Sequence, residues 1–264
     1  MELAITLIQL DIAPGDPIKN LKRMDQFVQQ AKKQGADLVV FPEDAVCGPL
    51  QGQLDFVAYA PEYLAHFQAL AAKHAIDIVP GTWTVADNGV LYNQAHYINA
   101  DGSLAGTYRK INLWETEKAH IAPGTLTSVF PTRFGLVGLI ICWDLTFPAM
   151  FSEMVAQGVE LVISPTYWSF TKPSEEVEGV VDDEILLIDS LCTTRAFENN
   201  ILLAYCNAAG ELSTPAGDTV LSGRSQITHP LTKVVVKAES NSEEMLFARL
   251  VLERTYAAPG SIGV

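Results

Sequence analysis

Three reactive side chains stand directly after apolar stretches of the sequence, at Glu43, Lys110 and Cys142. A thiol becomes a nucleophile once it loses its proton, a carboxylate can accept that proton, and an ammonium group stabilises developing negative charge. In α/β proteins, functional side chains gather where strands end, because the loops there can change without disturbing the core. The three positions therefore suggest one pocket equipped for nucleophilic chemistry.

Each of these residues also has an ordinary structural explanation. A free cysteine after an apolar strand is usually an inert core residue, and we expect this of Cys192 and Cys206. A glutamate after a strand often caps the following loop. For Lys110, the ordinary explanation is a lysine on a solvated surface. Taken singly, none of the three positions identifies a site.

The segments around these residues, taken together, resemble one family, the nitrilase-like carbon–nitrogen hydrolases. The matching segments are FPED (41–44), YRKINL (108–113), EKAHIAPG (117–124), ICWDLTFP (141–148), ELVISPTYW (160–168), TTRAFENN (193–200) and SGRSQITHP (222–230). The resemblance covers nearly the whole chain, and the motifs are specific in combination.

The resemblance implies four catalytic residues, which are Glu43, Lys110, Glu117 and Cys142. For the fourth role, Glu117 is preferred to Glu115. The following Lys118 and the Pro123-Gly124 pair align Glu117 with members that read Glu-Lys before an aromatic stretch and Pro-Gly. Glu115 stays the alternative.

The resemblance also implies an activity, the hydrolysis of a carbon–nitrogen bond in a small non-peptide amide or N-carbamoyl compound. Glu43 would remove the thiol proton, and Lys110 with the backbone N–H of Trp143 would stabilise the oxyanion. Ammonia or an amine would leave, and water would hydrolyse the thioester with Glu43 again as base. Glu117 would orient Lys110 and balance the charge of the pocket.

The residues expected to contact the substrate are partly aromatic. The family places the strand before Thr166 beside the nucleophile, so the expected lining is Trp143, Thr166, Tyr167 and Trp168, with Trp114 and Phe170 nearby. For Trp114 and Phe170, ordinary core packing competes as an explanation. The pair Trp143-Asp144 is more similar to the amidase and carbamoylase branches than to true nitrilases, which carry Trp-Glu.

Two alternatives to an amidase stay open. The same thiol would also suit nitrile hydrolysis, which Asp144 disfavours, and a non-catalytic scaffold would keep the same fold. Intact Glu43, Lys110 and Cys142 argue against the scaffold, because a scaffold needs no buried thiol, ammonium and carboxylate together.

An acidic run leads into one of the expected helices. It contains Glu175, Glu176, Glu178, Asp182, Asp183 and Glu184. Such a run usually forms a solvated loop followed by a capped helix. A loop of this charge over the pocket would favour a cationic or neutral substrate over a dicarboxylate.

A cysteine–histidine hydrolase is the competing mechanism. The five histidines are His66, His74, His96, His120 and His229. Only His120 lies near a motif, and the family gives it no catalytic role. No C-x-x-C or C-x-x-H pattern occurs, so neither a zinc site nor a disulfide framework is expected. We therefore expect no metal, no cofactor and a reducing, cytoplasmic setting.

The composition limits the partners. The 264 residues are 48% hydrophobic and carry a formal net charge of −14, which fits one domain over residues 1–264. An acidic surface repels phosphate backbones and anionic membranes, so no nucleic acid and no membrane is expected as a partner. The apolar run Leu3 to Leu10 is too short to span a bilayer, and we interpret it as a buried strand.

Apolar runs and helical patterns alternate along the chain, which predicts an α/β domain with helices outside the sheets. The resemblance implies the more specific four-layer α-β-β-α sandwich. Strands are expected at 2–10, 38–41, 76–83, 93–99, 104–109, 135–141, 161–164, 201–207, 225–229, 233–237 and 245–252. Helices are expected from Pro17 to a stop at Gly35, and at 61–74, 148–158 and 183–199.

Two of these helices predict assembly. Helices 148–158 and 183–199 carry more apolar residues than one sheet is expected to cover, and in the family the equivalent helices form a two-fold interface. We therefore expect a homodimer or a higher homo-oligomer.

Overall fold

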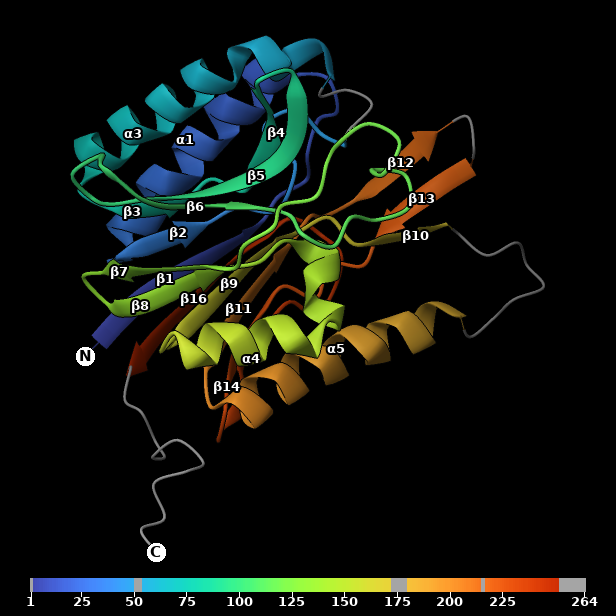
Figure 1. Cartoon of the computed structure of the whole chain (residues 1–264). Helices are drawn as coiled ribbons and strands as arrows, with labels where there is room; N and C mark the ends of the chain where they lie inside the picture. The colour runs from blue at the N-terminus through green and yellow to red at the C-terminus, as the bar shows by residue number, and fades with distance from the viewer. Residues whose placement is uncertain (1, 50–53, 172–179, 215–216, 252–264) are drawn as a thin grey trace, which may run out of the picture.

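Two β-sheets pack face to face, and helices cover the outer side of each sheet (Figure 1). The structure, a computed structural model, describes residues 2–49, 54–171, 180–214 and 217–251. Helices α1 (Pro17–Lys33) and α3 (Ala60–His74) lie on one side of the molecule, and α4 (Pro148–Ala156) and α5 (Val180–Asn199) lie on the other. This arrangement confirms the predicted α-β-β-α sandwich.

The first sheet has seven strands in the order β16-β1-β2-β3-β5-β4, with β6 paired to β5. Its central strands β1, β2 and β3 are parallel and buried where they pair, because the helices cover one face and the second sheet covers the other. The bounds are β1 (Glu2–Gln9), β2 (Leu38–Val40), β3 (Asp77–Val79), β4 (Thr82–Asp87), β5 (Val90–Ile98), β6 (Leu104–Arg109) and β16 (Glu244–Val251).

The second sheet has six strands in the order β15-β14-β11-β9-β8-β7, with β8, β9 and β11 parallel. A further three-stranded sheet has the order β10-β13-β12. The bounds are β7 (Ser128–Thr132), β8 (Gly135–Leu139), β9 (Leu161–Thr166), β10 (Ser169–Thr171), β11 (Leu202–Asn207), β12 (Glu211–Thr214), β13 (Gly217–Leu221), β14 (Gln226–His229) and β15 (Lys233–Lys237).

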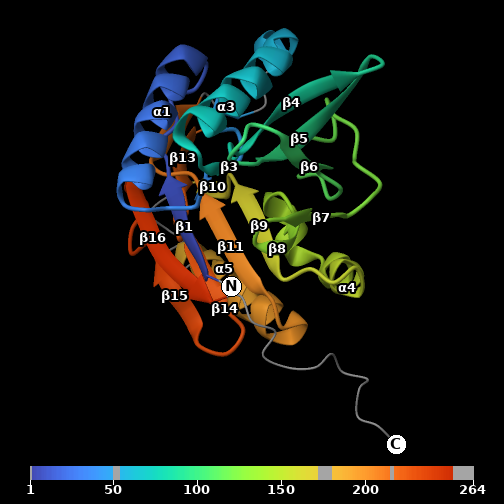
Figure 2. The same cartoon turned by 90° about the vertical axis from the view of Figure 1, so that its left-hand side faces the viewer.

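The hydrophobic core consists of two clusters of buried residues. The larger cluster extends from the space between the sheets through the second sheet to helices α4 and α5, and includes Ile5 of β1, Ile163 of β9 and Ile188 of α5, all fully buried. The second cluster fills the space between the first sheet and helices α1 and α3, and includes Val28 and Phe67. Figure 2 shows the strands of both sheets running side by side between the helix pairs. Packing in both clusters holds the strands, and therefore the strand ends, in fixed positions.

Helix α1 begins as the sequence predicts. The Asp16 side chain accepts a hydrogen bond from the backbone N–H of Lys19 at 3.0 Å, and Pro17 occupies the first turn. An aspartate cap satisfies one of the free N–H groups at the helix start, and proline lacks a donor that would be left unpaired there. The predicted N-terminus of this helix is confirmed.

The single strand predicted at 76–83 is wrong. The segment forms two strands, β3 and β4, which are separated by Pro80-Gly81, with Gly81 in the left-handed region at φ +82°. After this break, β4 and β5 form a hairpin that turns at Asn88-Gly89. Asn-Gly is a strong hairpin signal. The prediction of one strand through Pro80 left out β4, which is the strand that pairs with β5 across this turn.

Strands β7, β10, β12 and β13 are absent from the sequence prediction. β7 contains Pro131 and lies at the edge of the second sheet, where a missing backbone donor is tolerated.

The expected acidic run covers residues 175–184, and its part up to residue 179 lies outside the described residues. Helix α5 begins at Val180, earlier than the expected residue 183.

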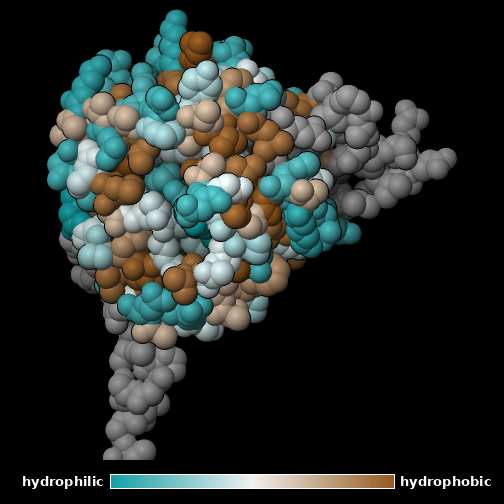
Figure 3. Space-filling view, turned by 45° about the horizontal axis from the view of Figure 1, so that its top comes forward, coloured by the Kyte–Doolittle hydropathy of each residue, from teal (hydrophilic) through white to brown (hydrophobic). Residues whose placement is uncertain are grey.

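The surface drawn in Figure 3 mixes hydrophilic and hydrophobic side chains, with hydrophobic ones gathered near the middle of that face. Within the described ranges, no helix has both the length and the apolar character needed to cross a bilayer.

Candidate active site

The candidate catalytic residues come from both sheets and meet at one end of the sandwich. Glu43 follows β2, Lys110 follows β6 directly, and Cys142 opens a short 3-10 helix, η2 (Cys142–Thr146), after β8. Together with Glu117, they line one cavity of about 370 Å³. Residues far apart in the sequence meet here because the parallel strands of each sheet end at the same edge.

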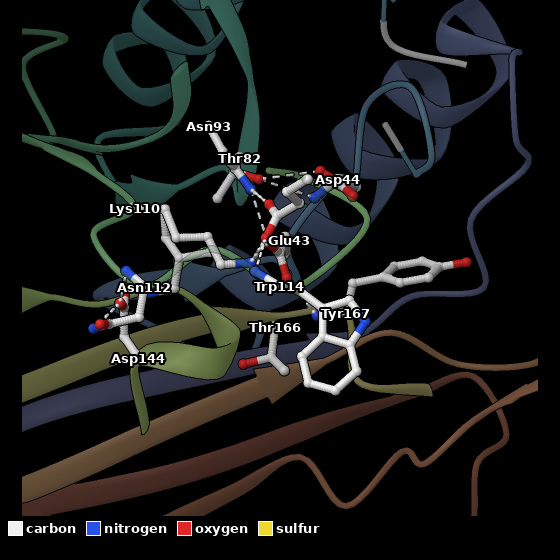
Figure 4. A network of polar contacts seen from close by, with 12 residues as sticks. Glu43, Asp44, Thr82, Asn93, Lys110, Asn112, Trp114, Asp144, Thr166 and Tyr167 are labelled. Atoms are coloured by element: carbon white, nitrogen blue, oxygen red, sulfur yellow. Dashed lines mark hydrogen bonds and ion pairs between the residues drawn. The ribbon is translucent and has the colours of Figure 1, made fainter. Parts of the chain in front are cut away.

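Lys110 lies between two carboxylates. Its Nζ is 2.8 Å from Oε1 of Glu43 and 2.8 Å from Oε2 of Glu117. The side chain of Lys110 is 2% exposed, that of Glu43 is 4% exposed and that of Glu117 is 11% exposed, so solvent ions screen these pairs weakly. Figure 4 shows the ammonium group pointing toward Glu43. The cation is therefore fixed from two sides.

Asn93 of β5, which no sequence motif singled out, contacts the same two carboxylates. Its Nδ2 donates to Oε1 of Glu43 at 2.8 Å and to Oε1 of Glu117 at 3.1 Å. Its Oδ1 is buried without a hydrogen-bond partner in the described part of the chain. The available signal was its place in the strand, because alternation puts Asn93 on the same buried face as Ala95.

Backbone groups hold the remaining carboxylate oxygens. The N–H of Tyr167 donates to Oε2 of Glu43 at 2.9 Å, and the N–H of Trp114 donates to Oε2 of Glu117 at 2.7 Å. Backbone donors are rigid and favour the charged form of a carboxylate. The orientation of both carboxylates is thus set by the fold and by Lys110 and Asn93 together.

Cys142 adopts an unusual backbone conformation. Its φ of +47° lies in the left-handed region, although it is not a glycine. Such a conformation costs of order 1–3 kcal/mol and persists only where the surrounding structure holds it. The residue is 8% exposed and lines the cavity. The sharp turn after β8 therefore presents the thiol to the cavity.

Asp144 holds this turn from behind. Its Oδ2 accepts from the backbone N–H of Ile141 at 3.0 Å and from the hydroxyl of Tyr108 at 2.7 Å. Its Oδ1 accepts from the backbone N–H of Asn112 at 2.8 Å. Asp144 is fully buried and is not among the described residues that line the cavity. It therefore ties the nucleophile's turn to the segment that follows Lys110.

Burial changes the proton affinities of the three central groups. Burial raises the pKa of the Glu43 carboxyl, with Lys110 opposing and Glu117 reinforcing this change. Burial, and then the charge of Glu43, raise the pKa of the Cys142 thiol well above its usual range. Burial alone would lower the pKa of Lys110, but the charges of Glu43, Cys142 and Glu117 outweigh it and raise that pKa. The resting site therefore holds a neutral thiol beside a charged ammonium group.

The two candidates for the fourth role occupy different environments. Glu117 is buried against Lys110, whereas the Glu115 side chain is 76% exposed and pairs with Lys118, three residues further along the chain. An exposed pair of this kind contributes little to stability or to a site. The geometry brings Glu117, and not Glu115, into the group around Lys110.

The expected substrate-binding residues divide into two groups. Trp143, Tyr167 and Trp168 line the cavity, as does Trp114. Thr166 does not, because its side chain is fully buried and its Oγ1 donates to the backbone oxygen of Ser164 at 3.2 Å. Phe170 is also not among the described lining residues. Thr166 supports the strand end and does not face the cavity.

The other cysteines and the histidines lie away from the cavity. The remaining thiols, of Cys47, Cys192 and Cys206, are buried and unpaired. All five histidines belong to the described residues, and none of them lines the cavity. His96 is buried against the ring of Trp83, and burial lowers its pKa to about 4. The described cavity therefore offers no imidazole as a base for Cys142.

Comparison with known proteins identifies the family. The model of the carbon-nitrogen hydrolase family matches residues 4–259. A probable nitrilase of Schizosaccharomyces pombe is 29% identical, over 93% of this chain and 88% of the relative. A 2-oxoglutaramate amidase of Bacillus subtilis is 27% identical, over 92% of this chain and 88% of the relative.

A solved structure shares the same fold. The crystal structure of a carbon-nitrogen hydrolase from Helicobacter pylori superposes with a TM-score of 0.88 at 26% identity, and the match covers 96% of this chain and 90% of that chain. The family match spans both sheets and every candidate catalytic residue. The chain belongs to the carbon–nitrogen hydrolase family.

Proposed function

We propose that the protein is a cysteine-dependent hydrolase that cleaves a small non-peptide amide or N-carbamoyl compound through a thioester on Cys142. One observation carries this proposal. The thiol lines a cavity in which Lys110 is fixed between the buried carboxylates of Glu43 and Glu117. A nucleophile, a base and a fixed cation are the groups that acyl transfer requires.

The reaction begins with proton transfer from the Cys142 thiol to Glu43, a carboxylate whose raised pKa makes it a stronger base. The sulfur attacks the carbonyl carbon, and Lys110 and the backbone N–H of Trp143 stabilise the oxyanion. Glu43 then gives its proton to the nitrogen, the carbon–nitrogen bond breaks, and ammonia or an amine leaves.

The second half of the reaction removes the acyl group. Water gives a proton to Glu43 as it attacks the thioester, and a second oxyanion forms in the same place. The carbon–sulfur bond then breaks, the thiolate takes back the proton, and the acid leaves. Glu117 holds Lys110 in both halves of the reaction by the contact at 2.8 Å.

Release of ammonia from a panel of amides, carbamoyl amines and nitriles tests this function. We expect turnover of at least one amide or carbamoyl amine, and loss of turnover in Cys142→Ala and Cys142→Ser with an unchanged circular dichroism spectrum. Mass spectrometry should locate an electrophilic amide analogue on Cys142. An adduct on Cys192 or Cys206 would contradict the assignment.

Nitrile hydrolysis is the second candidate, supported by the name of the Schizosaccharomyces pombe relative. Against it stands the residue after Trp143, which is Asp144 and not the glutamate usual in nitrilases. Because Asp144 braces the turn and lies outside the described cavity lining, any influence on the substrate passes through the position of Cys142. The nitriles in the panel decide between the two candidates.

We also propose a homodimer built on helix α5. Leu186 is 62% exposed and Phe197 is 69% exposed, and the two lie about three helical turns apart on one face. Large apolar side chains that are exposed on one helix face are typical of a surface that meets another protein. Helix α4 gives less support than the sequence suggested, because Met150, Phe151 and Met154 are buried within the chain.

Two further proposals concern the chain as a whole. We propose that residues 1–264 form one domain, since a single core cluster is shared by both sheets. We propose a reducing, cytoplasmic compartment, since four unpaired cysteines are common where thiols stay reduced.

A further inference from the structure

Three tryptophans form one wall of the cavity. The ring centroids of Trp114 and Trp143 are 4.7 Å apart, and those of Trp143 and Trp168 are 5.3 Å apart. All three residues line the cavity. The face of an indole ring is electron-rich and attracts ammonium groups more strongly than other aromatic rings do. This wall suits an alkyl chain that ends in a cation.

A carboxylate stands at the same wall. Glu184 of α5 lines the cavity, and its Oε2 accepts a hydrogen bond from Nε1 of Trp168 at 3.1 Å. This bond fixes the carboxylate against the tryptophan wall. Asp44, next to Glu43, adds a second negative charge to the lining. Neither residue takes part in the reaction steps described above.

Cations are scarce around the cavity. Of the described residues that line it, Lys110 alone carries a positive charge, and Glu43 and Glu117 both contact its ammonium group. Among the described lining residues, a carboxylate at the far end of a substrate would meet Glu184 or Asp44 and no unmatched cation. The net charge of −14 adds a field that repels anions from the whole surface.

We infer that this hydrolase prefers amides whose far end carries an ammonium group, and that Glu184 and the tryptophan wall bind that group. The inference rests on the proposed function and gives it a substrate class. It also separates this protein from the Bacillus subtilis relative, which is named for an amide that carries a carboxylate. Neutral amides should be weaker substrates, and anionic amides the weakest.

Three amides with the same five-carbon chain test the inference. 5-Aminopentanamide ends in an ammonium group, pentanamide in a methyl group and glutaric acid monoamide in a carboxylate. We expect kcat/KM for 5-aminopentanamide to exceed that for pentanamide by about tenfold, since a partly desolvated charge pair with an aromatic face adds this much. The monoamide should fall below both. Equal rates, or the monoamide as best substrate, would overturn the inference.

Charge variants identify the residue responsible. Glu184→Gln should lower the ratio of the ammonium amide to pentanamide, because only the tryptophan wall and Asp44 would then favour the cation, and Glu184→Lys should make the monoamide the better charged substrate. Asp183→Lys is the matched control, because this neighbouring residue on α5 is exposed and is not among the described lining residues. It introduces the same change of net charge as Glu184→Lys and should leave the order of substrates unchanged.

A binding measurement separates this inference from the proposed chemistry. Calorimetry on Cys142→Ala should show 5-aminopentanamide binding about tenfold more tightly than pentanamide, and Glu184→Gln in that background should reduce the difference. Binding with this order but no hydrolysis of any amide would refute the proposed function alone. Hydrolysis without a charge preference in rate or binding would refute the charge inference alone.

Discussion

The polar atoms around Lys110 form a closed ring. Lys110 bridges Glu43 and Glu117 on one side, and Nδ2 of Asn93 bridges the same two carboxylates on the other. Hydrogen bonds inside a low-dielectric site are stronger than in water, and each carboxylate here contacts both Lys110 and Asn93. The ring thus fixes the distance between the base and the second carboxylate, although no two of its four members are neighbours in the sequence.

Replacing Asn93 should change the pH dependence of the reaction. Asn93→Leu keeps the branched shape of the side chain but removes a donor that favours the charged form of Glu43. Burial already raises the pKa of Glu43, and Glu43 must be ionised to act as base. The acid limb of kcat/KM should therefore move to higher pH by about one pH unit.

Gln94→Leu is the control for Asn93→Leu, because Gln94 points to the other face of β5 and contacts Arg109. Its pH profile should match that of the unmodified protein. An unshifted acid limb in Asn93→Leu, with turnover merely reduced, would assign Asn93 a structural role only.

Glu115 and Glu117 should respond differently to the loss of their charge. Glu117→Gln removes one of the two charges that balance the buried Lys110, and a buried charge that loses a partner typically costs about 3–5 kcal/mol. Turnover should fall by orders of magnitude. Glu115→Gln removes a charge that is 76% exposed, and turnover should stay nearly unchanged.

Steady-state turnover of both variants, with circular dichroism to show folding, checks this pair. A folded and active Glu117→Gln beside an inactive Glu115→Gln would move the fourth role to Glu115.

Sequence motifs predicted the reactive side chains better than the residues that hold those side chains in position. Glu43, Lys110 and Cys142 stand out by type and position, and Glu117 by its motif. Asn93 went unnoticed, because an amide in a strand has no chemical signature until its partners are placed. Thr166 shows the opposite case, since this motif residue next to the site is fully buried and is not among the described lining residues.

Among the elements, the break between β3 and β4 positions the base. Gly81 lies against the residue before Glu43, and a Cβ added at Gly81 would stand 1.9 Å from the backbone oxygen of Pro42. The backbone there is left-handed, at φ +82°. The run of apolar residues predicted one strand here, because it gave no sign that the chain must bend around the loop that carries Glu43.

Alanine substitution at the two ends of β4 should distinguish close packing from backbone strain. Gly81→Ala meets both the clash with Pro42 and the left-handed backbone, and should lower the free energy of unfolding by about 2–5 kcal/mol. Gly89→Ala has a similar φ of +80° but open space around the new carbon, and should cost about 1–2 kcal/mol.

Urea unfolding of both variants measures the difference, and turnover adds a functional readout. Gly81→Ala should also lower turnover, because any shift of Pro42 moves Glu43. Equal stability losses at the two glycines would show that contact with Pro42 does not constrain this loop.

For the whole molecule, the order of the layers explains why one cavity collects these residues. β2 and β8 belong to different sheets, and both sheets contribute parallel strands that end beside the cavity. Alternation of strands and helices predicted an α/β fold, but the pairing of two sheets came from the family resemblance. Local patterns do not encode which strands pair, since the pairing depends on contacts far apart in the sequence, such as β1 with β16.

The proposed dimer makes the last prediction. If α5 packs against a second copy, then placing charges at Leu186 and Phe197 should break the interface, because a charge is poorly tolerated in an apolar contact. Sedimentation velocity at micromolar concentration should show a dimer for the unmodified protein and a monomer for Leu186→Glu/Phe197→Glu. Ile18→Glu is the control, since Ile18 on α1 is 81% exposed and lies on the opposite helix layer. This variant should stay dimeric, whereas a monomeric unmodified protein, or an unaffected double variant, would refute an interface on α5.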